Sequence, residues 1–556
     1  MKSVGSFLVD CLIELGVSRI YGVPGDYNLE FLELIESSNH IKFIGTCNEL
    51  NASYAADGEA RIQGISVVLT TYGVGDLAAL PGLAGAYAEG VPVLSISGAP
   101  PLHAIRSKAL LHHTLADGNY ENVMNCFREF TVAQALITPE NAVDEIKRVI
   151  QACWREKRPA YLQLPSDVCS IEIDTPIQAL KIDINSSERS QLDAAANLIT
   201  TRLIRAKRPV LILDSMVRSQ QLKDQVGKLV DTLNIDFTTL GSAKAILPES
   251  SPHYLGLYNG KASSQALFDR ISKADLILSL GVRFVDSTSA WFSQSLNPAS
   301  IIDIQPFSVT ADNEYFANVN VSELLDAIVK NMSSVVSSIQ ISSADSGSSQ
   351  KDRIECDQKW CQKTFWQYIN HFISSGDVVI AENGTSLTGL LQLKFPAGCD
   401  FVCQSIWGAI GYTLPALLGT SLAAQERRQL LFIGDGSFQL TVQELSTILR
   451  HNLNPVIFLI NNKGYTIERM ILGESSSYND IADWNYTKLP SVFAPSMPVH
   501  SVVVSNIQEL EDALNIATVP EKPIFIEVRF DIMDSPYGMS AFGKMARDYD
   551  YKPVVK

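Results

Sequence analysis

The sequence alternates short apolar runs, rich in β-branched residues, with segments of helical periodicity along its whole length. The clearest apolar runs are residues 66–70, 91–96, 209–213, 275–280, 430–433 and 456–460. Continuous apolar strands of this kind are buried on both faces, which is typical of parallel sheets covered by helices. The alternation therefore predicts an α/β fold built from several doubly wound units with mainly parallel sheets.

Two polar segments divide the 556 residues into three expected domains. Residues 175–191 are polar without clear periodicity, and residues 333–350 contain nine Ser among 18 residues, as in a flexible linker. The expected domains are residues 1–175, 190–330 and 355–556. The first and third share an outline of strand, glycine turn, helix, proline and strand. That outline is common in doubly wound sheets, so it indicates duplication only weakly.

The charge balance argues against nucleic-acid and membrane partners. Lys and Arg total 44 and Asp and Glu total 60, which gives a net charge of −16. A sequence-independent grip on nucleic acid or anionic lipid needs a basic face, and no run of Lys and Arg is longer than a pair such as Arg427-Arg428. No stretch of about 18 uncharged apolar residues indicates a membrane span.

The cysteines and the N-terminus indicate a cytoplasmic protein. The nine cysteines are odd in number and scattered, without the spacing of a zinc site, so we expect reduced thiols. Asp10 and Glu14 interrupt the apolar N-terminal stretch, which predicts an amphipathic helix and not a secretory signal.

The strongest chemical signal is Gly434-Asp435-Gly436-Ser437, followed one strand later by Asn461-Asn462. Two glycines after a buried strand allow a tight turn close to a ligand, and a helix expected to begin near Thr441 favours an anion there. Asp435 would repel a bare phosphate unless a cation bridged the two. Asp435, Asn462 and a Gly464 carbonyl, with two phosphate oxygens and a water, would make an octahedral Mg²⁺ site. A plain βα turn is the alternative for Gly-Asp-Gly alone.

Five segments together carry a family resemblance. GDGS…INN (434–462), YGVPGDYN (21–28), NELNASYAADG (48–58), HHTLADG (112–118) and NKGYTIE (462–468) resemble the motifs of thiamine diphosphate-dependent 2-oxo acid decarboxylases, such as pyruvate, indolepyruvate and branched-chain 2-oxo acid decarboxylases. The resemblance implies a thiamine diphosphate-binding fold, in which an N-terminal pyrimidine-binding domain and a C-terminal diphosphate- and Mg²⁺-binding domain flank a central α/β domain. The implied reaction is non-oxidative decarboxylation to an aldehyde and CO₂, with thiamine diphosphate as electron sink.

The resemblance also implies site residues. Glu49 would exchange a proton with the cofactor's aminopyrimidine, which an apolar environment favours because it disfavours the charged carboxylate. Asp26, His112, His113 and Glu468 would hold the substrate carboxylate and move protons. The implied cofactor-binding residues are Glu49, Gly408, Ala409, Ile410, Asp435, Gly436, Ser437, Asn462, Gly464, Tyr465, Thr466 and Ile467.

Purely structural explanations of the same residues stay open. Glu49 could be a first-turn helix acid, and residues 408–410 could be ordinary helix packing. On an extended segment, His112 and His113 would point to opposite faces and could not do the same job. Glu468 could pair with a neighbouring Arg or cap a helix.

The resemblance further predicts a substrate pocket formed by Asn383, Leu387, Ile467, Ile471 and Phe542. Leu387 stands where the family often has a bulky aromatic residue, which would leave more room. Asn383 departs from the Thr of some pyruvate-specific members. We therefore expect broad use of medium aliphatic or aromatic 2-oxo acids.

Glu49 and Asp435 lie in different predicted domains. The resemblance implies that two chains share each active site, in a homodimer that often pairs into a homotetramer. Two rival functions stay open: a carboligase of the acetohydroxyacid synthase kind, which would release acetolactate, and a non-catalytic nucleotide-binding α/β protein, whose melting temperature would not respond to thiamine diphosphate and Mg²⁺.

Overall fold

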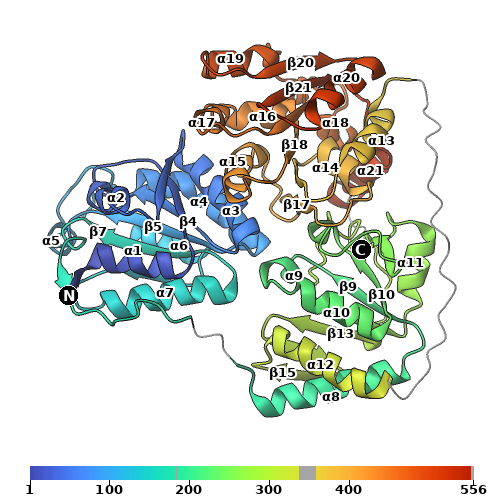
Figure 1. The fold of residues 1–556 in the computed structure, drawn as a ribbon, viewed down its shortest axis with the longest axis horizontal. Coiled ribbons are helices and arrows are strands. Elements are labelled where there is room, and N and C mark those ends of the chain that lie inside the picture. The colour runs from blue at the N-terminus through green and yellow to red at the C-terminus, as the bar shows by residue number, and fades with distance from the viewer. Residues whose placement is uncertain (183–185, 337–358, 553–556) are drawn as a thin grey trace.

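The computed structural model describes residues 1–182, 186–336 and 359–552. Three sheets covered by helices form an N-terminal, a central and a C-terminal domain, drawn in Figure 1 in blue to cyan, green to yellow, and orange to red. This confirms the predicted α/β fold with mainly parallel sheets. The exact domain boundaries stay a prediction: the last central helix, α12 (Val321–Val336), enters the Ser-rich segment, and residues 337–350 of that segment lie outside the described residues.

The N-terminal sheet has six parallel strands. Their order is β3 (Lys42–Gly45), β2 (Arg19–Gly22), β4 (Ser66–Thr71), β5 (Val93–Ala99), β7 (Ala160–Pro165) and β6 (Gln134–Leu136). The helices are α1 (Val4–Glu14), α2 (Leu29–Glu36), α3 (Glu49–Gln63), α4 (Val74–Glu89), α5 (Leu102–Ser107), α6 (Asn122–Arg128) and α7 (Ala142–Glu156). A short ribbon pairs β1 (Lys2–Ser3) with β8 (Glu172–Ile173).

The central sheet has seven strands. The first five run parallel, and the sixth pairs antiparallel with both the fifth and the seventh. Their order is β11 (Tyr254–Leu257), β10 (Asp236–Thr239), β9 (Pro209–Leu213), β12 (Leu276–Leu280), β13 (Ile301–Gln305), β14 (Ser308–Ala311) and β15 (Glu314–Ala317). The helices besides α12 are α8 (Arg189–Arg205), α9 (Met216–Ser219), α10 (Lys223–Leu233) and α11 (Gln265–Ser272).

The C-terminal sheet again has six parallel strands. Their order is β17 (Asp400–Val402), β16 (Val378–Ala381), β18 (Gln429–Gly434), β19 (Val456–Asn461), β21 (Ile524–Arg529) and β20 (His500–Val504). The helices are α13 (Gln362–Phe372), α14 (Thr385–Leu391), α15 (Thr413–Ala423), α16 (Asp435–Thr441), α17 (Glu444–Arg450), α18 (Thr466–Ile471), α19 (Leu489–Phe493), α20 (Ile507–Ala517) and α21 (Met539–Asp550). Numbered within each domain, both outer sheets have the order 2-1-3-4-6-5, so their likeness extends to topology.

The helix after Gly434 begins earlier than predicted. The expectation of a start near Thr441 is wrong, because α16 begins at Asp435 and ends at Thr441. Gly434 is extended (φ −72°, ψ 154°) and occupies the N-cap position, so the chain turns directly from strand into helix. Asp435 consequently lies in the first turn, where a carboxylate is favoured.

The outer domains pack together through α3 and α15, which lie side by side in Figure 1. A Cβ atom on Gly58 would come within 2.4 Å of the Ala416 carbonyl oxygen, and one on Gly419 within 1.9 Å of the Ala55 carbonyl oxygen. The two backbones therefore approach more closely than any side chain would allow. One apolar core continues across both domains.

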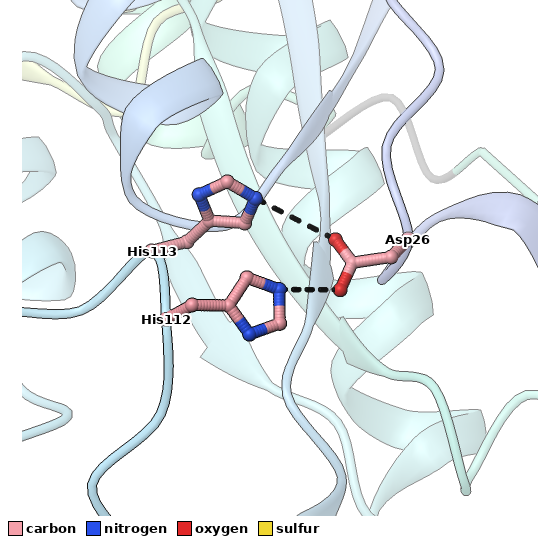
Figure 2. A group of neighbouring side chains, drawn as sticks. All are labelled: Asp26, His112 and His113. Carbon is pink, nitrogen blue, oxygen red and sulfur yellow. Dashed lines mark hydrogen bonds and ion pairs between the residues drawn. The ribbon is translucent and has the colours of Figure 1, made fainter.

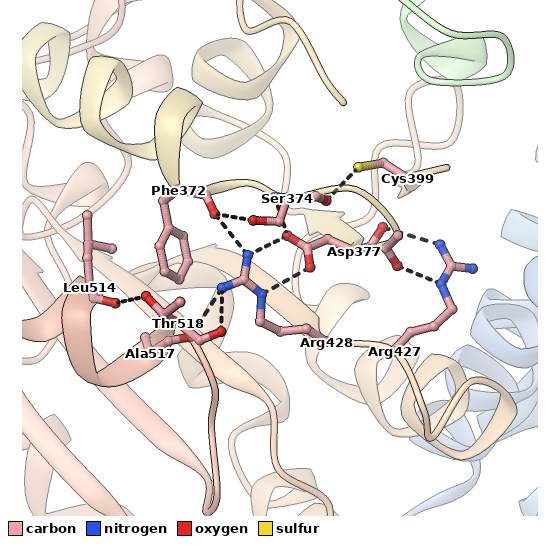
Figure 3. Close-up of polar contacts among 10 residues, drawn as sticks. Phe372, Ser374, Asp377, Cys399, Arg427, Arg428, Leu514, Ala517 and Thr518 are labelled. Atoms are coloured by element: carbon pink, nitrogen blue, oxygen red, sulfur yellow. Dashed lines mark hydrogen bonds and ion pairs between the residues drawn. The ribbon is translucent and has the colours of Figure 1, made fainter. Parts of the chain in front are cut away.

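The pair Arg427-Arg428 anchors the amino end of the C-terminal sheet (Figure 3). Arg428 binds Asp377 through two hydrogen bonds of 3.0 and 2.6 Å and also donates to the Phe372 carbonyl at 2.9 Å. Arg427 pairs with Asp400 at 2.5 Å. The basic pair thus has internal partners and is not part of a basic face.

In the three described ranges, no helix combines the length and the apolar character that crossing a bilayer requires.

Candidate active site

Asp435 lies buried between the carboxyl ends of β18 and β19. Its carboxylate accepts hydrogen bonds from the backbone amides of Gly436 (2.8 Å) and Gly464 (3.2 Å). The residue is 1% exposed, and burial raises its pKa to about 6. No Lys or Arg side chain of the described residues forms an ion pair with it. A buried carboxylate without a positive partner is costly, so this position suits a cation.

The nearby donor atoms suit Mg²⁺ in particular. Asn462 is buried and follows β19 directly, and the Gly464 carbonyl belongs to the same turn. Carboxylate, amide and carbonyl oxygens are the hard ligands that Mg²⁺ prefers. The first turn of α16 presents Gly436 and Ser437 to the same space, and a Cβ on Gly436 would come within 2.5 Å of the Tyr465 ring.

A second segment braces this turn. Gly464 has a φ of +125°, and a Cβ there would lie 2.1 Å from the Asn479 carbonyl oxygen, which also accepts from the Tyr465 amide at 3.0 Å. The buried Arg469 donates to the Glu474 carbonyl (3.1 Å) and pairs with Asp480 (2.5 Å). Sequence reasoning missed Arg469, which appeared there only as a partner for Glu468.

Residues 408–412 form a loop and not a helix, which removes the helix-packing reading of Gly408, Ala409 and Ile410. Gly408 and Gly411 both have positive φ (68° and 83°), and the Ile410 side chain is exposed. Asn383 donates to the Ala409 carbonyl at 3.4 Å.

Glu382 supports this loop and was also missed. It directly follows β16 and is fully buried; its carboxylate accepts from the Thr413 hydroxyl (2.6 Å) and from the Asn383 amide (3.0 Å). Burial raises its pKa to about 7. Its only sequence signal was an acid at the end of an apolar strand.

The N-terminal domain brings Asp26, His112 and His113 together (Figure 2). His112 Nε2 lies 2.6 Å from Asp26 Oδ2, and His113 Nε2 lies 3.7 Å from Asp26 Oδ1. The prediction that the two histidines point to opposite faces is wrong. His113 has a φ of +61°, so the backbone turns there and both rings face the same carboxylate.

Glu49 lies near this group, because two glycines at the start of α4 contact Glu49 on one side and His113 on the other. A Cβ on Gly75 would lie 3.1 Å from Glu49 Oε1, and one on Gly73 would lie 2.0 Å from the His113 carbonyl oxygen. Glu49 is the first residue of α3, whose N-cap Asn48 accepts from the Asn51 amide. The first-turn position and a place at the site are therefore compatible.

Several other predicted residues lie on the helices α14, α18 and α21. Glu468 is exposed on α18, Ile467 and Ile471 are half-buried on the same helix, and Leu387 is half-buried on α14. Phe542 on α21 packs edge-on against Trp291 of the central domain, with ring centroids 4.6 Å apart. Sequence reasoning missed Trp291.

The predicted residues thus form two groups. Asp26, Glu49, His112 and His113 belong to the N-terminal domain, and the residues around Asp435 belong to the C-terminal domain. Among the described residues of this chain, no hydrogen bond or ion pair joins the two groups.

Comparison with known proteins gives three consecutive family matches. The chain matches the N-terminal TPP binding domain of thiamine pyrophosphate enzymes over residues 2–119, their central domain over 196–332 and their C-terminal TPP binding domain over 384–528. It is 37% identical over 548 residues to an alpha-keto-acid decarboxylase of Mycobacterium leprae (strain TN), covering 98% of this chain and 96% of that protein. It is 39% identical over 546 residues to one of Mycobacterium avium (strain 104), covering 96% and 95%. The chain therefore belongs to the thiamine pyrophosphate enzyme family, together with these alpha-keto-acid decarboxylases.

Proposed function

We propose that this protein decarboxylates 2-oxo acids non-oxidatively to aldehydes and CO₂, with thiamine diphosphate and Mg²⁺. The observation that carries the proposal is the buried Asp435, which accepts from backbone amides and, within the described ranges, forms no ion pair with a cationic side chain. The relatives named alpha-keto-acid decarboxylase, at nearly full length, support the same activity.

The C-terminal domain would hold the charged end of the cofactor. Asp435, Asn462 and the Gly464 carbonyl would bind Mg²⁺, and Gly436 and Ser437 would bind the diphosphate at the start of α16. Gly408, Ala409 and Ile410 would hold the aminopyrimidine, and Tyr465, Thr466 and Ile467 would line the cofactor. The bound cofactor supplies a carbanion nucleophile and an electron sink.

The N-terminal domain would manage protons. Glu49 would hold and return the proton of the aminopyrimidine. Asp26, His112 and His113, with Glu468, would orient the substrate carboxylate and deliver the proton that completes the aldehyde. The contacts of both histidines with Asp26 support this assignment, because they bring three groups capable of acid–base chemistry to one point.

We further propose that two chains share each site, in a homodimer that pairs into a homotetramer. Exposed apolar side chains lie beside both halves. Val74 and Leu77 belong to the start of α4, where Gly73 and Gly75 lie, and Ile410 belongs to the loop of residues 408–412, with Trp407 directly before it and Leu440 next to Gly411. Exposed apolar patches commonly mark interfaces between proteins. We keep a cytoplasmic location in the proposal, since the described cysteines are free thiols.

For the substrate we propose medium aliphatic and aromatic 2-oxo acids. Asn383, Leu387, Ile467, Ile471 and Phe542 would form the pocket, and the smaller Leu387 leaves room for a longer side chain. Kinetics with pyruvate, 4-methyl-2-oxopentanoate and phenylpyruvate test this breadth. A strong preference for pyruvate would reject it.

The cofactor assignment is tested by thermal unfolding. Thiamine diphosphate with Mg²⁺ at 100 times the dissociation constant should stabilise the protein by about 2.7 kcal/mol. The D435N variant should show no such shift, because its neutral amide removes the carboxylate ligand. An equal shift in D435N would reject the assignment.

A further inference from the structure

We propose that Asp26, His112 and His113 form a site for a zinc-type transition-metal ion, distinct from the Mg²⁺ site, and that metal bound there inhibits the enzyme reversibly. Figure 2 shows the three side chains facing one another, and Asp26 belongs to the loop that follows the carboxyl end of β2. Each offers one ligand atom, and these atoms lie within 4.8 Å of one another.

The spacing suits a tetrahedral ion. Zinc binds His nitrogen and carboxylate oxygen at about 2.0 to 2.1 Å, so neighbouring tetrahedral ligands lie about 3.3 Å apart. His113 Nε2 lies 3.7 Å from Asp26 Oδ1, and His112 Nε2 lies 2.6 Å from the other carboxylate oxygen, Oδ2; these separations lie on either side of this value. Small side-chain rotations would bring both Nε2 atoms and one of these oxygens around one ion.

The donor chemistry selects the class of metal. Two imidazoles and one carboxylate suit Zn²⁺, Cu²⁺ or Ni²⁺, whereas Mg²⁺ prefers oxygen ligands. The other ring nitrogen of His112, Nδ1, lies 3.4 Å from the Tyr27 hydroxyl, and the two rings stack. A second hydrogen bond of this kind orients ligating histidines in metal proteins.

The backbone around the ligands is held in place. Gly73 packs closely against the His113 carbonyl, and Gly25, next to Asp26, packs against Thr71. In the single chain the side chains are accessible, at 60% exposed for His112, 45% for Asp26 and 33% for His113. Three protein ligands and an open side leave a fourth position for water or a substrate carboxylate.

Inhibition follows from the occupied lone pairs. A metal ion on both Nε2 atoms and on one Asp26 oxygen occupies the lone pairs through which the two imidazoles accept a proton, and its positive charge makes the carboxylate a weaker base. This part of the inference rests on the proposed function, whereas metal binding itself rests on the geometry alone.

Binding is tested directly with Zn²⁺ in competition with a chromophoric zinc indicator, on protein kept in saturating Mg²⁺ and thiamine diphosphate. We expect one tight site per chain, weakened at least about tenfold in D26N, H112Q and H113Q. The H103Q variant is the matched control, because His103 contacts a single carboxylate, Asp167, at 3.1 Å, and its zinc affinity should equal that of wild type. Co²⁺ should give the visible absorption of a tetrahedral site in wild type and H103Q only.

The outcomes separate the two claims. Zinc binding that is unchanged in D26N, H112Q and H113Q, or absent from wild type, overturns the metal site even if the enzyme makes aldehyde. Zinc binding in a protein that makes no aldehyde leaves the metal site standing and removes the proposed function. Aldehyde formation that Zn²⁺ at site-saturating concentration leaves unchanged overturns the inhibitory role.

Discussion

Gly464 shows how one residue position can govern the cation-binding turn. Its φ of +125° is open to glycine and strained for other residues, and the Asn479 carbonyl fills the space that a Cβ would need. The preceding residue, Lys463, also has positive φ. The turn that presents Asn462 therefore depends on a backbone shape that few sequences adopt.

The variant G464A should lose about 2 kcal/mol or more of unfolding free energy without any cofactor, because left-handed strain and a clash add. Urea unfolding of the cofactor-free protein measures this loss. The control G434A has an ordinary φ of −72° and nothing within 4 Å of its Cβ, so it should lose no more than about 1 kcal/mol, the cost of Ala at an N-cap. Equal losses in both variants would contradict the steric explanation.

Glu382 predicts a dependence of stability on pH. Its folded-state pKa of about 7 lies above the ordinary value of 4.5, so the folded protein retains a proton that the unfolded chain has released between these values. The stabilisation is fully present below pH 4.5 and is lost as the pH rises through 7. Relative to E382Q, wild type should lose about 3 kcal/mol over this window. A difference between wild type and E382Q that stays constant with pH would exclude this role.

At the scale of elements, the amino ends of the C-terminal sheet carry an ion pair that joins two strands, and the carboxyl ends carry residues of the candidate site. Asp377 directly precedes β16 and Arg428 directly precedes β18, and their hydrogen bonds join the two strands. Glu382 and Asp435 directly follow the ends of the same two strands. The Arg428–Asp377 pair thus joins the amino ends of the two strands whose carboxyl ends carry Asp435 and Glu382.

Breaking this anchor should be costly. The variant R428M leaves the Asp377 carboxylate, whose side chain is 4% exposed, without its partner, so about 3 kcal/mol of unfolding free energy should be lost. The exposed pair Arg189–Asp193 is the control, and R189M should cost less than about 1 kcal/mol. Urea unfolding compares the two; similar losses would show that the buried pair is not an anchor.

The elements differ in how far sequence could predict them. The strands before Asp435 and Asn462 were predictable, because continuous apolar runs signal buried parallel strands whose carboxyl ends meet at one edge. The turn at His113 was not, because a non-glycine residue with positive φ carries no sequence signal. The start of α16 was placed too late, since the two glycines of the motif conceal a helix that already begins at Asp435. Trp291 and Arg469 act through contacts between distant segments, which local patterns do not show.

At the scale of the whole molecule, the two groups of site residues lie in different domains of one chain. Close packing of α3 on α15 fixes these domains relative to each other. Completing a site by rearrangement within the chain would break that packing. In the proposed dimer, a second chain docked on the exposed apolar residues near Val74 and Ile410 would complete both sites without such a change.

Mixed dimers test this arrangement. E49Q and D435N should each be inactive alone. Coexpressed with different tags, half of the dimers would be mixed, and each mixed dimer would contain one site with both wild-type residues. Activity should therefore recover to about a quarter of wild type. Activity no greater than that of the separate variants would indicate that each chain builds its own site.

The central claim is that this chain turns 2-oxo acids into aldehydes and CO₂ with thiamine diphosphate and Mg²⁺. The most direct measurement is the yield of both products from a panel of 2-oxo acids, using protein stripped of cofactor and then reconstituted. We predict equal amounts of aldehyde and CO₂, formed only when both cofactors are present. Acetolactate as the main product, or no product from any acid of the panel, would contradict the claim.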